Sequence, residues 1–154
     1  MTTQSQPSGA ARPAPTKPVP RPENPEVTKP FWEAAKLGRL VMQRCSLCGN
    51  WVFYPRELCP ECFLPNLAWA QVSGRGRVYA FTVVHQAAPA FQSDTPYVLA
   101  VIQLDEGIRM LSNVVGCDPQ DVRVDMMVEA VFESINPDWT LVKFQPAGLA
   151  PGSG

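Results

Sequence analysis

Four cysteines stand in two pairs, with two residues inside each pair and ten between the pairs: Cys45, Cys48, Cys59 and Cys62. A Cys-x2-Cys turn lets two thiolates converge on one ion while the backbone N–H groups of the turn point at the sulfur atoms. Two such turns complete the tetrahedral shell that zinc prefers in structural sites, and iron also fits a cage of this kind. We therefore predict one structural metal ion, zinc before iron.

The residue after each cysteine pair must adopt the backbone conformation that closes the turn. Gly49 follows the first pair and permits the left-handed bend that such a turn needs. Phe63 stands at the matching position after the second pair, so we expect a less favourable backbone conformation or a different turn shape there. Cys117 has no neighbouring cysteine, and we predict a half-buried side chain at the end of a strand.

Residues for catalysis are scarce. The four thiolates leave no coordination position for an activated water, so the predicted metal is not catalytic. His85 is the only histidine, the chain has no phosphate-binding loop, and Asp105 and Glu106 are better explained as hairpin-turn residues. We predict no catalytic residues and expect the chain to bind or to assist rather than to act as an enzyme.

The elements that must position the cysteines begin after a proline-rich stretch. Residues 1–27 lack the apolar side chains of a folded segment, and we predict that they are disordered. A short helix should follow from Thr28, as N-cap, to Gly38, with Phe31 and Trp32 packed on a second element or on a partner. Two short strands and a connector complete a ribbon module over residues 28–72: Leu40–Arg44, Trp51–Tyr54 and, as connector, Leu64–Gln71.

Five β-prone runs follow the Ser73–Gly76 boundary: Arg77–His85, Tyr97–Leu104, Ile108–Val115, Val128–Ile135 and Thr140–Phe144. Five strands with a longer link between the third and the fourth are typical of an OB-fold, and an SH3-like barrel is the competing topology. The link at residues 116–127 has room for a turn of helix. The predicted fold is mainly β, with the OB-fold over residues 73–146 and a disordered tail at 147–154.

Composition limits the partners. The chain of 154 residues has 45% apolar residues, a formal charge of -1 and a pI near 5.8. It lacks the cationic field that sequence-independent phosphate binding requires, so we expect no nucleic acid as partner. The sequence contains no apolar stretch of membrane-spanning length and no signal-peptide pattern, from which we expect a cytoplasmic protein without membrane contact.

A longer string of motifs supports a resemblance. It joins Pro30–Trp32, Arg44–Gly49, Tyr54–Arg56, Cys59–Cys62, Ser73–Tyr79, Thr82–His85, Pro96–Val98 and Leu104–Gly107. This string resembles the acyl-CoA-associated zinc-ribbon OB-fold proteins, once catalogued as a domain of unknown function. Two residues depart from the family pattern: Phe63 replaces a glycine, and Met127 stands where a proline is common.

The resemblance implies a short helix, a rubredoxin-like zinc ribbon and an OB-fold. Similar proteins are small subunits of thiolase-superfamily enzymes, or occur with enoyl-CoA hydratases, in the degradation of lipids, steroids and aromatic compounds. It thus implies a non-catalytic accessory subunit of a hetero-oligomer that binds or positions an acyl-CoA thioester. The candidate acyl-CoA-binding residues lie near the helix and the ribbon: Phe31, Trp32, Lys36, Arg44, Tyr54 and Arg56.

Two other functions stay open. Zinc ribbons and OB-folds also bind single-stranded nucleic acid by stacking bases on strand aromatics, for which Tyr79, Phe81 and Tyr97 are available. The chain could instead be a structural adaptor that joins copies of a larger enzyme without touching its substrate.

Overall fold

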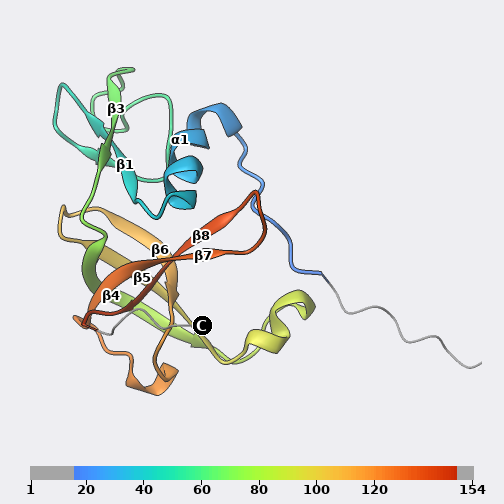
Figure 1. The fold of residues 1–154 in the computed structure, drawn as a ribbon. Coiled ribbons are helices and arrows are strands. Elements are labelled where there is room, and N and C mark those ends of the chain that lie inside the picture. The colour runs from blue at the N-terminus through green and yellow to red at the C-terminus, as the bar shows by residue number, and fades with distance from the viewer. Residues whose placement is uncertain (1–15, 149–154) are drawn as a thin grey trace, which may run out of the picture.

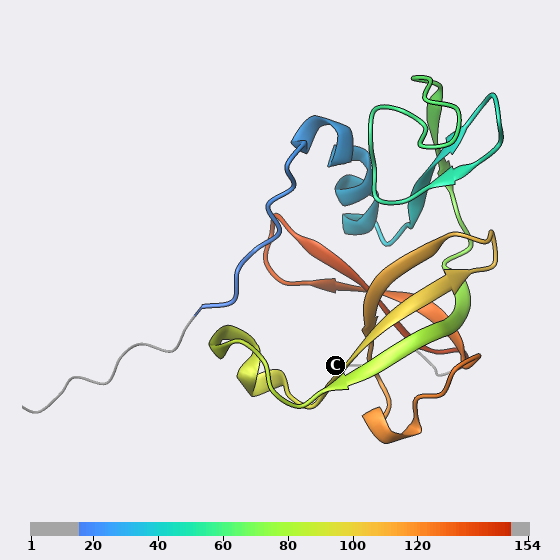
Figure 2. The same ribbon diagram turned by 180° about the vertical axis from the view of Figure 1, so that it is seen from behind.

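One helix and two β-sheets make up the fold (Figure 1). The computed structural model describes residues 16–148, so parts of the two predicted disordered tails, residues 1–15 and 149–154, lie outside the described residues. A three-stranded sheet has the order β2-β1-β3, and a closed barrel has the order β4-β5-β6-β8-β7. The helix contacts strands of both sheets and lies between them, as the view from behind also shows (Figure 2).

The helix α1 spans Pro25–Lys36 and therefore begins three residues before the predicted start. Thr28 is not the N-cap: it lies inside the helix, and its Oγ1 donates a hydrogen bond to the carbonyl oxygen of Asn24 at 3.2 Å. Pro25 is tolerated because the first helical residue needs no N–H partner. Gly38, with φ +68°, follows the helix and ends it as predicted.

The ribbon sheet has β1 (Val41–Cys45) in the centre, paired antiparallel to β2 (Trp51–Val52) and β3 (Leu67–Gln71). The prediction of a connector over residues 64–71 is wrong, because the last five of these residues form β3. They pair with β1 along its full length, on the side opposite to β2, so both edges of β1 are hydrogen-bonded. The second predicted hairpin strand is shorter than expected, ending at Val52.

The barrel contains the five predicted strands, each within two residues of its predicted limits: β4 (Arg75–Val84), β5 (Tyr97–Leu104), β6 (Arg109–Val114), β7 (Met127–Ser134) and β8 (Thr140–Pro146). The third barrel strand, β6, lies beside the fifth, β8, in parallel orientation. This Greek-key closure favours the OB-fold over the SH3-like alternative.

Two short 3-10 helices lie outside the sheets. The helix η2 (Pro119–Asp121) occupies the link between β6 and β7, where a helical turn was predicted. Asp118 caps it by accepting a hydrogen bond from the backbone N–H of Gln120. The helix η1 (Pro89–Asp94), between β4 and β5, was not predicted. No helix among residues 16–148 has both the length and the apolar character needed to cross a bilayer.

One hydrophobic core serves both sheets. Its barrel part includes the fully buried Phe144, whose removal from water contributes roughly 2–3 kcal/mol. The core continues through Phe31 of α1 into Leu40 and Met42 at the base of the ribbon. Trp32 packs edge to face against Trp139, with ring centroids 5.0 Å apart. The two adjacent helix aromatics thus pack within the chain, which fixes the ribbon relative to the barrel.

Candidate metal centre and the surface around it

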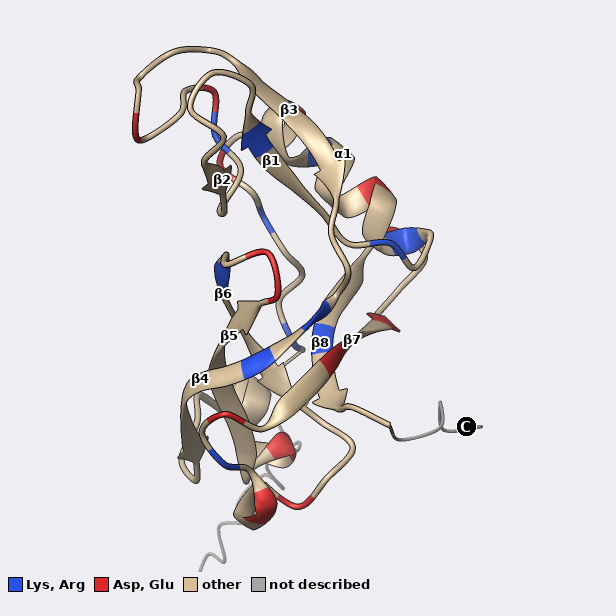
Figure 3. Ribbon diagram, turned by 90° about the vertical axis from the view of Figure 1, so that its left-hand side faces the viewer, with Lys and Arg blue, Asp and Glu red and all other residues tan. Residues whose placement is uncertain are grey.

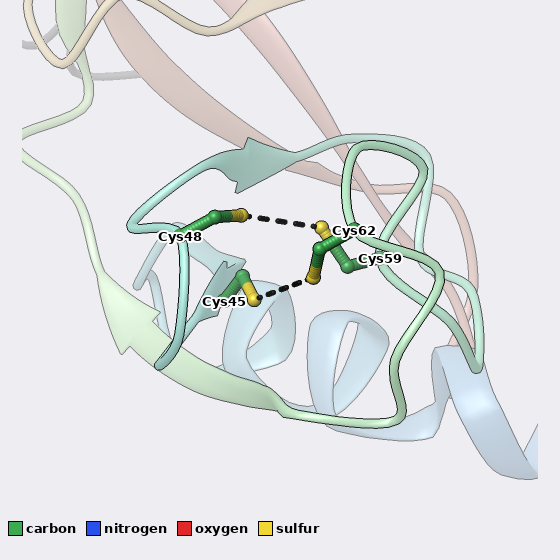
Figure 4. Close-up of side chains that lie close together, drawn as sticks. All are labelled: Cys45, Cys48, Cys59 and Cys62. Carbon is green, nitrogen blue, oxygen red and sulfur yellow. Dashed lines mark hydrogen bonds between the residues drawn. The ribbon is translucent and has the colours of Figure 1, made fainter.

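The four cysteines of the two Cys-x2-Cys turns meet at one point of the ribbon (Figure 4). All four Sγ atoms lie within 4.8 Å of one another, and the Cys45–Cys62 and Cys48–Cys59 pairs are each 3.6 Å apart. A tetrahedron with metal–sulfur bonds of about 2.3 Å has sulfur–sulfur edges of about 3.8 Å. The spacing therefore fits one tetrahedral ion and is far too long for a disulfide bond.

The two turns contain the same backbone hydrogen bond. In the first, the backbone N–H of Gly49 donates to the carbonyl oxygen of Cys45 at 3.0 Å; in the second, the N–H of Phe63 donates to that of Cys59 at 2.9 Å. The amides of Leu47 and Cys48 also point at the sulfur of Cys45. Such N–H donors stabilise thiolates, so the chain itself prepares both turns for a cation.

The prediction about the residue after each pair is confirmed by the backbone. Gly49 has φ +72° and Phe63 has φ +58°, so both adopt the left-handed conformation. Glycine adopts it at no steric cost, whereas a bulky aromatic residue rarely does.

The cysteine thiols divide into two classes. The N–H of Cys48, with help from the N–H of Leu47, lowers the pKa of Cys45 to about 6, and the N–H of Cys62 lowers the pKa of Cys59. The N–H of Asn50 also favours the Cys48 thiolate, but desolvation of its sulfur atom within the cluster and the three surrounding cysteines outweigh it and raise the pKa of Cys48 to about 12. The N–H of Leu64 favours the Cys62 thiolate, but desolvation and the neighbouring Cys45 and Cys59 outweigh it and raise the pKa of Cys62. The cage thus attracts a cation that can replace its remaining protons.

The other residues considered for chemistry lie apart from this cage. Cys117 is half-buried after the end of β6, and burial, with Asp121 and Asp118 nearby, raises the pKa of its thiol. His85 is exposed and forms no hydrogen bond or ion pair within residues 16–148. Glu106 lies in the β5–β6 turn, where its carboxylate accepts a hydrogen bond from the backbone N–H of Ser73 at 2.6 Å. The structure therefore assigns Glu106 a contact at the joint between ribbon and barrel.

The structure places the aromatic acyl-CoA candidates in one row beneath the ribbon. Phe31 contacts Trp32 and Phe53, and Phe53 in turn contacts Tyr54, with ring centroids 5.1 to 5.9 Å apart. Phe31 is only 4% exposed and belongs to the core, whereas Tyr54 is 39% exposed. Trp32 is half-buried, and its indole Nε1 has no hydrogen-bond partner in the described chain. The row thus ends at the surface at Tyr54.

The three cationic candidates are exposed. Arg44 lies over the ring of Trp51, 5.1 Å from its centroid. The Nε of Arg56 donates to the backbone oxygen of Tyr54 at 3.3 Å, while Lys36, at the end of α1, forms no ion pair within residues 16–148. Arg56 and Tyr54 are therefore together, and the remaining two cations occupy separate places on the helix and the ribbon.

Sequence reasoning did not find Gln43, which holds this region in shape. Its side chain is buried, its Oε1 accepts from the backbone N–H of Arg56 at 2.9 Å, and its Nε2 donates to the backbone oxygen of Arg56 at 3.0 Å. A glutamine in the middle of the short strand β1 was the only signal, and it does not reveal its partner. The pair fixes the loop that carries Tyr54 and Arg56.

A groove of about 1080 Å³ crosses the barrel between the N-terminal segment and the strands. Residues 16–19 form one wall, held by an ion pair between Lys17 and Asp94 at 2.6 Å. The opposite wall comes from β5, β6, β7 and β8 and combines apolar side chains with the charged Glu133 and Lys143. Charged residues on the barrel strands include both signs (Figure 3), and Lys143 of β8 forms an ion pair with Glu133 of β7 at 2.5 Å.

Comparison with known families matches most of the described chain. Residues 32–68 match a model described as the ChsH2 rubredoxin-like zinc ribbon domain, and residues 69–133 match the ChsH2 C-terminal OB-fold domain. A solved chain described as "Ltp2-ChsH2(DUF35) aldolase" superposes with a TM-score of 0.73 at 36% identity, covering 82% of this chain and 99% of that one.

Curated relatives carry two kinds of name. A DUF35 domain-containing scaffold protein of Methanocaldococcus jannaschii is 43% identical, over 64% of this chain and 71% of its own length. A probable enoyl-CoA hydratase alpha subunit of Thermomonospora curvata is 39% identical over 76% of this chain, and the benzoylsuccinyl-CoA thiolase subunit BbsA of Geobacter metallireducens is 30% identical over 56%. The match spans only 37% of the hydratase subunit and 56% of BbsA. With the zinc-ribbon and OB-fold domains both matched, this chain belongs to the ChsH2 (DUF35) family, which includes proteins named as scaffold proteins.

Proposed function

We propose that the chain is a non-catalytic accessory subunit that docks on a thiolase-like or enoyl-CoA hydratase-like enzyme and helps to position its acyl-CoA thioester. The observation that carries the proposal is the closed cage of four cysteines joined to an OB-fold, in a chain similar to subunits of CoA enzymes. The cage offers no open coordination position for a substrate, which leaves the metal a structural role.

We further propose that the ion in the cage is zinc. The four sulfur atoms suit zinc and iron equally in geometry, and the matched domain is described as a zinc ribbon. Cys45, Cys48, Cys59 and Cys62 would hold the ion, which would supply folding energy to the ribbon. Elemental analysis of the purified protein decides between the metals, since one equivalent of iron would also give the protein a visible colour.

The exposed candidates supply the contacts for CoA in this proposal. Its phosphates need cations, for which Lys36, Arg44 and Arg56 are exposed, and its adenine needs a flat surface, for which the half-exposed Tyr54 is available. Phe31 is buried, so its part is to support Trp32 and Tyr54 from behind through Phe53.

The test of the proposed docking is a co-purification of the tagged chain from its native host, with identification of any stoichiometric partner. We expect a thiolase-like or hydratase-like enzyme that uses an acyl-CoA substrate. Recovery of nucleic acid or of a ribonucleoprotein, without such an enzyme, would reject the proposal and reopen single-strand binding by the OB-fold.

The test of the substrate contact uses the complex recovered in this way. Arg44→Gln and Arg56→Gln together should raise the KM for the acyl-CoA about tenfold or more while the complex stays assembled, because charge-assisted contacts to phosphate are lost. Arg109→Gln is the matched control: this exposed arginine lies on the barrel, stacked 3.6 Å from the centroid of the Tyr79 ring. Unchanged KM in the double variant would identify a structural adaptor instead.

A further inference from the structure

Exposed apolar side chains gather next to the cysteine cage. Leu47 lies inside the first turn, Leu58 precedes the second, and Phe63 and Leu64 follow it. Their side chains are 59%, 48%, 74% and 45% exposed, in that order. Because each lies within two residues of a cysteine, and the four sulfur atoms are within 4.8 Å of one another, these side chains surround one site. We call Leu47, Leu58, Phe63 and Leu64 the knuckle patch.

The most exposed member of the knuckle patch occupies a strained position. Phe63 holds φ +58° at the place where the matching turn has Gly49. Contacts of the aromatic ring within the chain do little to offset the strain, since three quarters of its surface is exposed. The turn requires this backbone conformation but not an aromatic side chain, and residues held in unfavourable conformations cluster at functional sites. The ring is therefore positioned for a contact outside the chain.

In the segment that holds Leu58, Phe63 and Leu64, every charged side chain is acidic. Glu57 and Glu61 flank Leu58 and Cys59, and no lysine or arginine occurs from Glu57 to Gly74. Glu61 forms no ion pair within the described chain, while Glu57 accepts a hydrogen bond from the Asn24 side chain. A complementary surface would offer an apolar pocket with lysine or arginine at its rim. A symmetric contact between two copies of this chain would instead oppose acidic groups of the same sign.

We propose that the knuckle patch is the docking surface for the enzyme subunit, with Phe63 as its central anchor. The occupant is an apolar pocket with a cationic rim on the thiolase-like or hydratase-like partner; this inference rests on the proposed function. The ribbon carries the patch at the end of the molecule away from the barrel (Figure 1). Docking there leaves the barrel groove and Arg56, beside Tyr54, free for the substrate.

Phe63→Gly is the decisive variant because it removes the ring and also relieves the backbone. Thermal stability and metal content should stay at the wild-type level or rise, while the Kd for the enzyme recovered with the wild-type chain should increase tenfold or more. Leu47→Ser should weaken the same complex. Its matched control is Leu111→Ser, a leucine of equal exposure (60%) on barrel strand β6, which should leave Kd unchanged.

Charge reversal tests the acidic rim. Glu61→Lys should slow association several-fold at low salt, and the difference should shrink at high salt as the rim charges are screened. Wild-type Kd in both Phe63→Gly and Leu47→Ser would overturn the knuckle patch while the proposed function stands. Failure of the wild-type chain to recover any acyl-CoA enzyme would overturn both. A wild-type homodimer that Phe63→Gly converts to monomer, with enzyme binding intact, would also overturn the proposal.

Discussion

At the scale of single residues, the cage depends on backbone amides as much as on cysteine side chains. Cys45 and Cys59 are buried, and each sulfur accepts N–H groups from its own turn, whereas Cys48 is exposed. A turn that already points donors at its sulfur atoms loses little entropy when the ion arrives. Without an ion, however, partly charged sulfur atoms only 3.6 Å apart hold the turns together poorly.

Cys45→Ser is expected to abolish metal binding and to unfold the ribbon, because metal binding and folding are coupled in such modules. The measurement is metal content together with amide exchange in β1 and β3, which should lose their protection. Cys117→Ser is the control, since Cys117 lies outside the cage. Full metal content in Cys45→Ser would show that three sulfur ligands suffice.

Metal uptake should release protons. Near pH 8, Cys45, with its pKa lowered to about 6, is a thiolate, whereas Cys48 and Cys62, with raised pKa values, are thiols. Metal binding then displaces at least the protons of Cys48 and Cys62, so the apparent affinity should rise about 100-fold or more per pH unit near pH 8 and fall on acidification. Competition with a chromophoric chelator at several pH values measures this slope. A slope near zero would mean that all four thiols are already ionised.

At the scale of elements, glycines fix where the strands can approach each other. Gly76 is the second residue of β4, lies beside β5 and is paired to Leu104. A Cβ at this position would overlap the backbone carbonyl oxygen of Gln103, which belongs to a strand and cannot move aside. Gly38 presents the other case, since a Cβ there meets nothing within 4 Å and only φ +68° disfavours a side chain.

Gly76→Ala should therefore destabilise the barrel by about 2–4 kcal/mol, through forced separation of β4 from β5. Gly38→Ala should cost only about 1 kcal/mol, since its penalty is conformational. Chemical denaturation of the metal-loaded protein measures both. Equal losses in the two variants would show that β4 and β5 can separate without penalty at this point.

The sequence predicted elements well where the alternation of apolar residues was strong. Tyr97–Leu104 matches β5 residue for residue because every second side chain faces the core. The strand β3 was missed because Ala68 and Ala70 have low strand propensity, and only pairing with β1 makes this segment extended. The early start of α1 was missed because Pro25 and Pro30 are usually helix breakers.

The candidate site was predictable to a similar degree. Ligand spacing located the cage, and Phe63 was recognised as an unfavourable residue for its turn. The sequence did not predict which aromatic side chains are exposed: Phe31 and Tyr54 have similar side chains, yet Phe31 is 4% exposed and Tyr54 is 39% exposed. Which aromatic residue faces the core depends on how α1 packs between the sheets, and this is a tertiary property.

At the scale of the whole molecule, the ribbon and the barrel share a core but are joined by a short backbone segment. Val72 leaves the ribbon, Ser73 and Gly74 turn, and β4 begins at Arg75. Glu106 holds this turn, since its carboxylate accepts from both the N–H and the Oγ of Ser73, at 2.6 and 3.4 Å. The contact links the β5–β6 hairpin to the joint across 33 residues of sequence.

Glu106→Ala should leave both sheets folded and loosen their joint. We expect a loss of about 1 kcal/mol, the contribution of a hydrogen bond to a charged acceptor at an exposed site, and faster amide exchange at Ser73. Asp105→Ala is the control, because its ion pair with Arg75 is long, at 3.9 Å, and exposed. Wild-type exchange at Ser73 in Glu106→Ala would show that the core alone holds the joint.

The barrel closes asymmetrically. The ladder between β6 and β8 has a single register pair, Val114 with Phe144, supported by a hydrogen bond from the Oγ of Ser112 to the carbonyl oxygen of Val142 at 2.8 Å. Because this ladder is the shortest in the barrel, we expect local opening to begin here while the other strands stay paired. The groove is lined by residues of the same two strands, so we expect its width to change with opening of this seam.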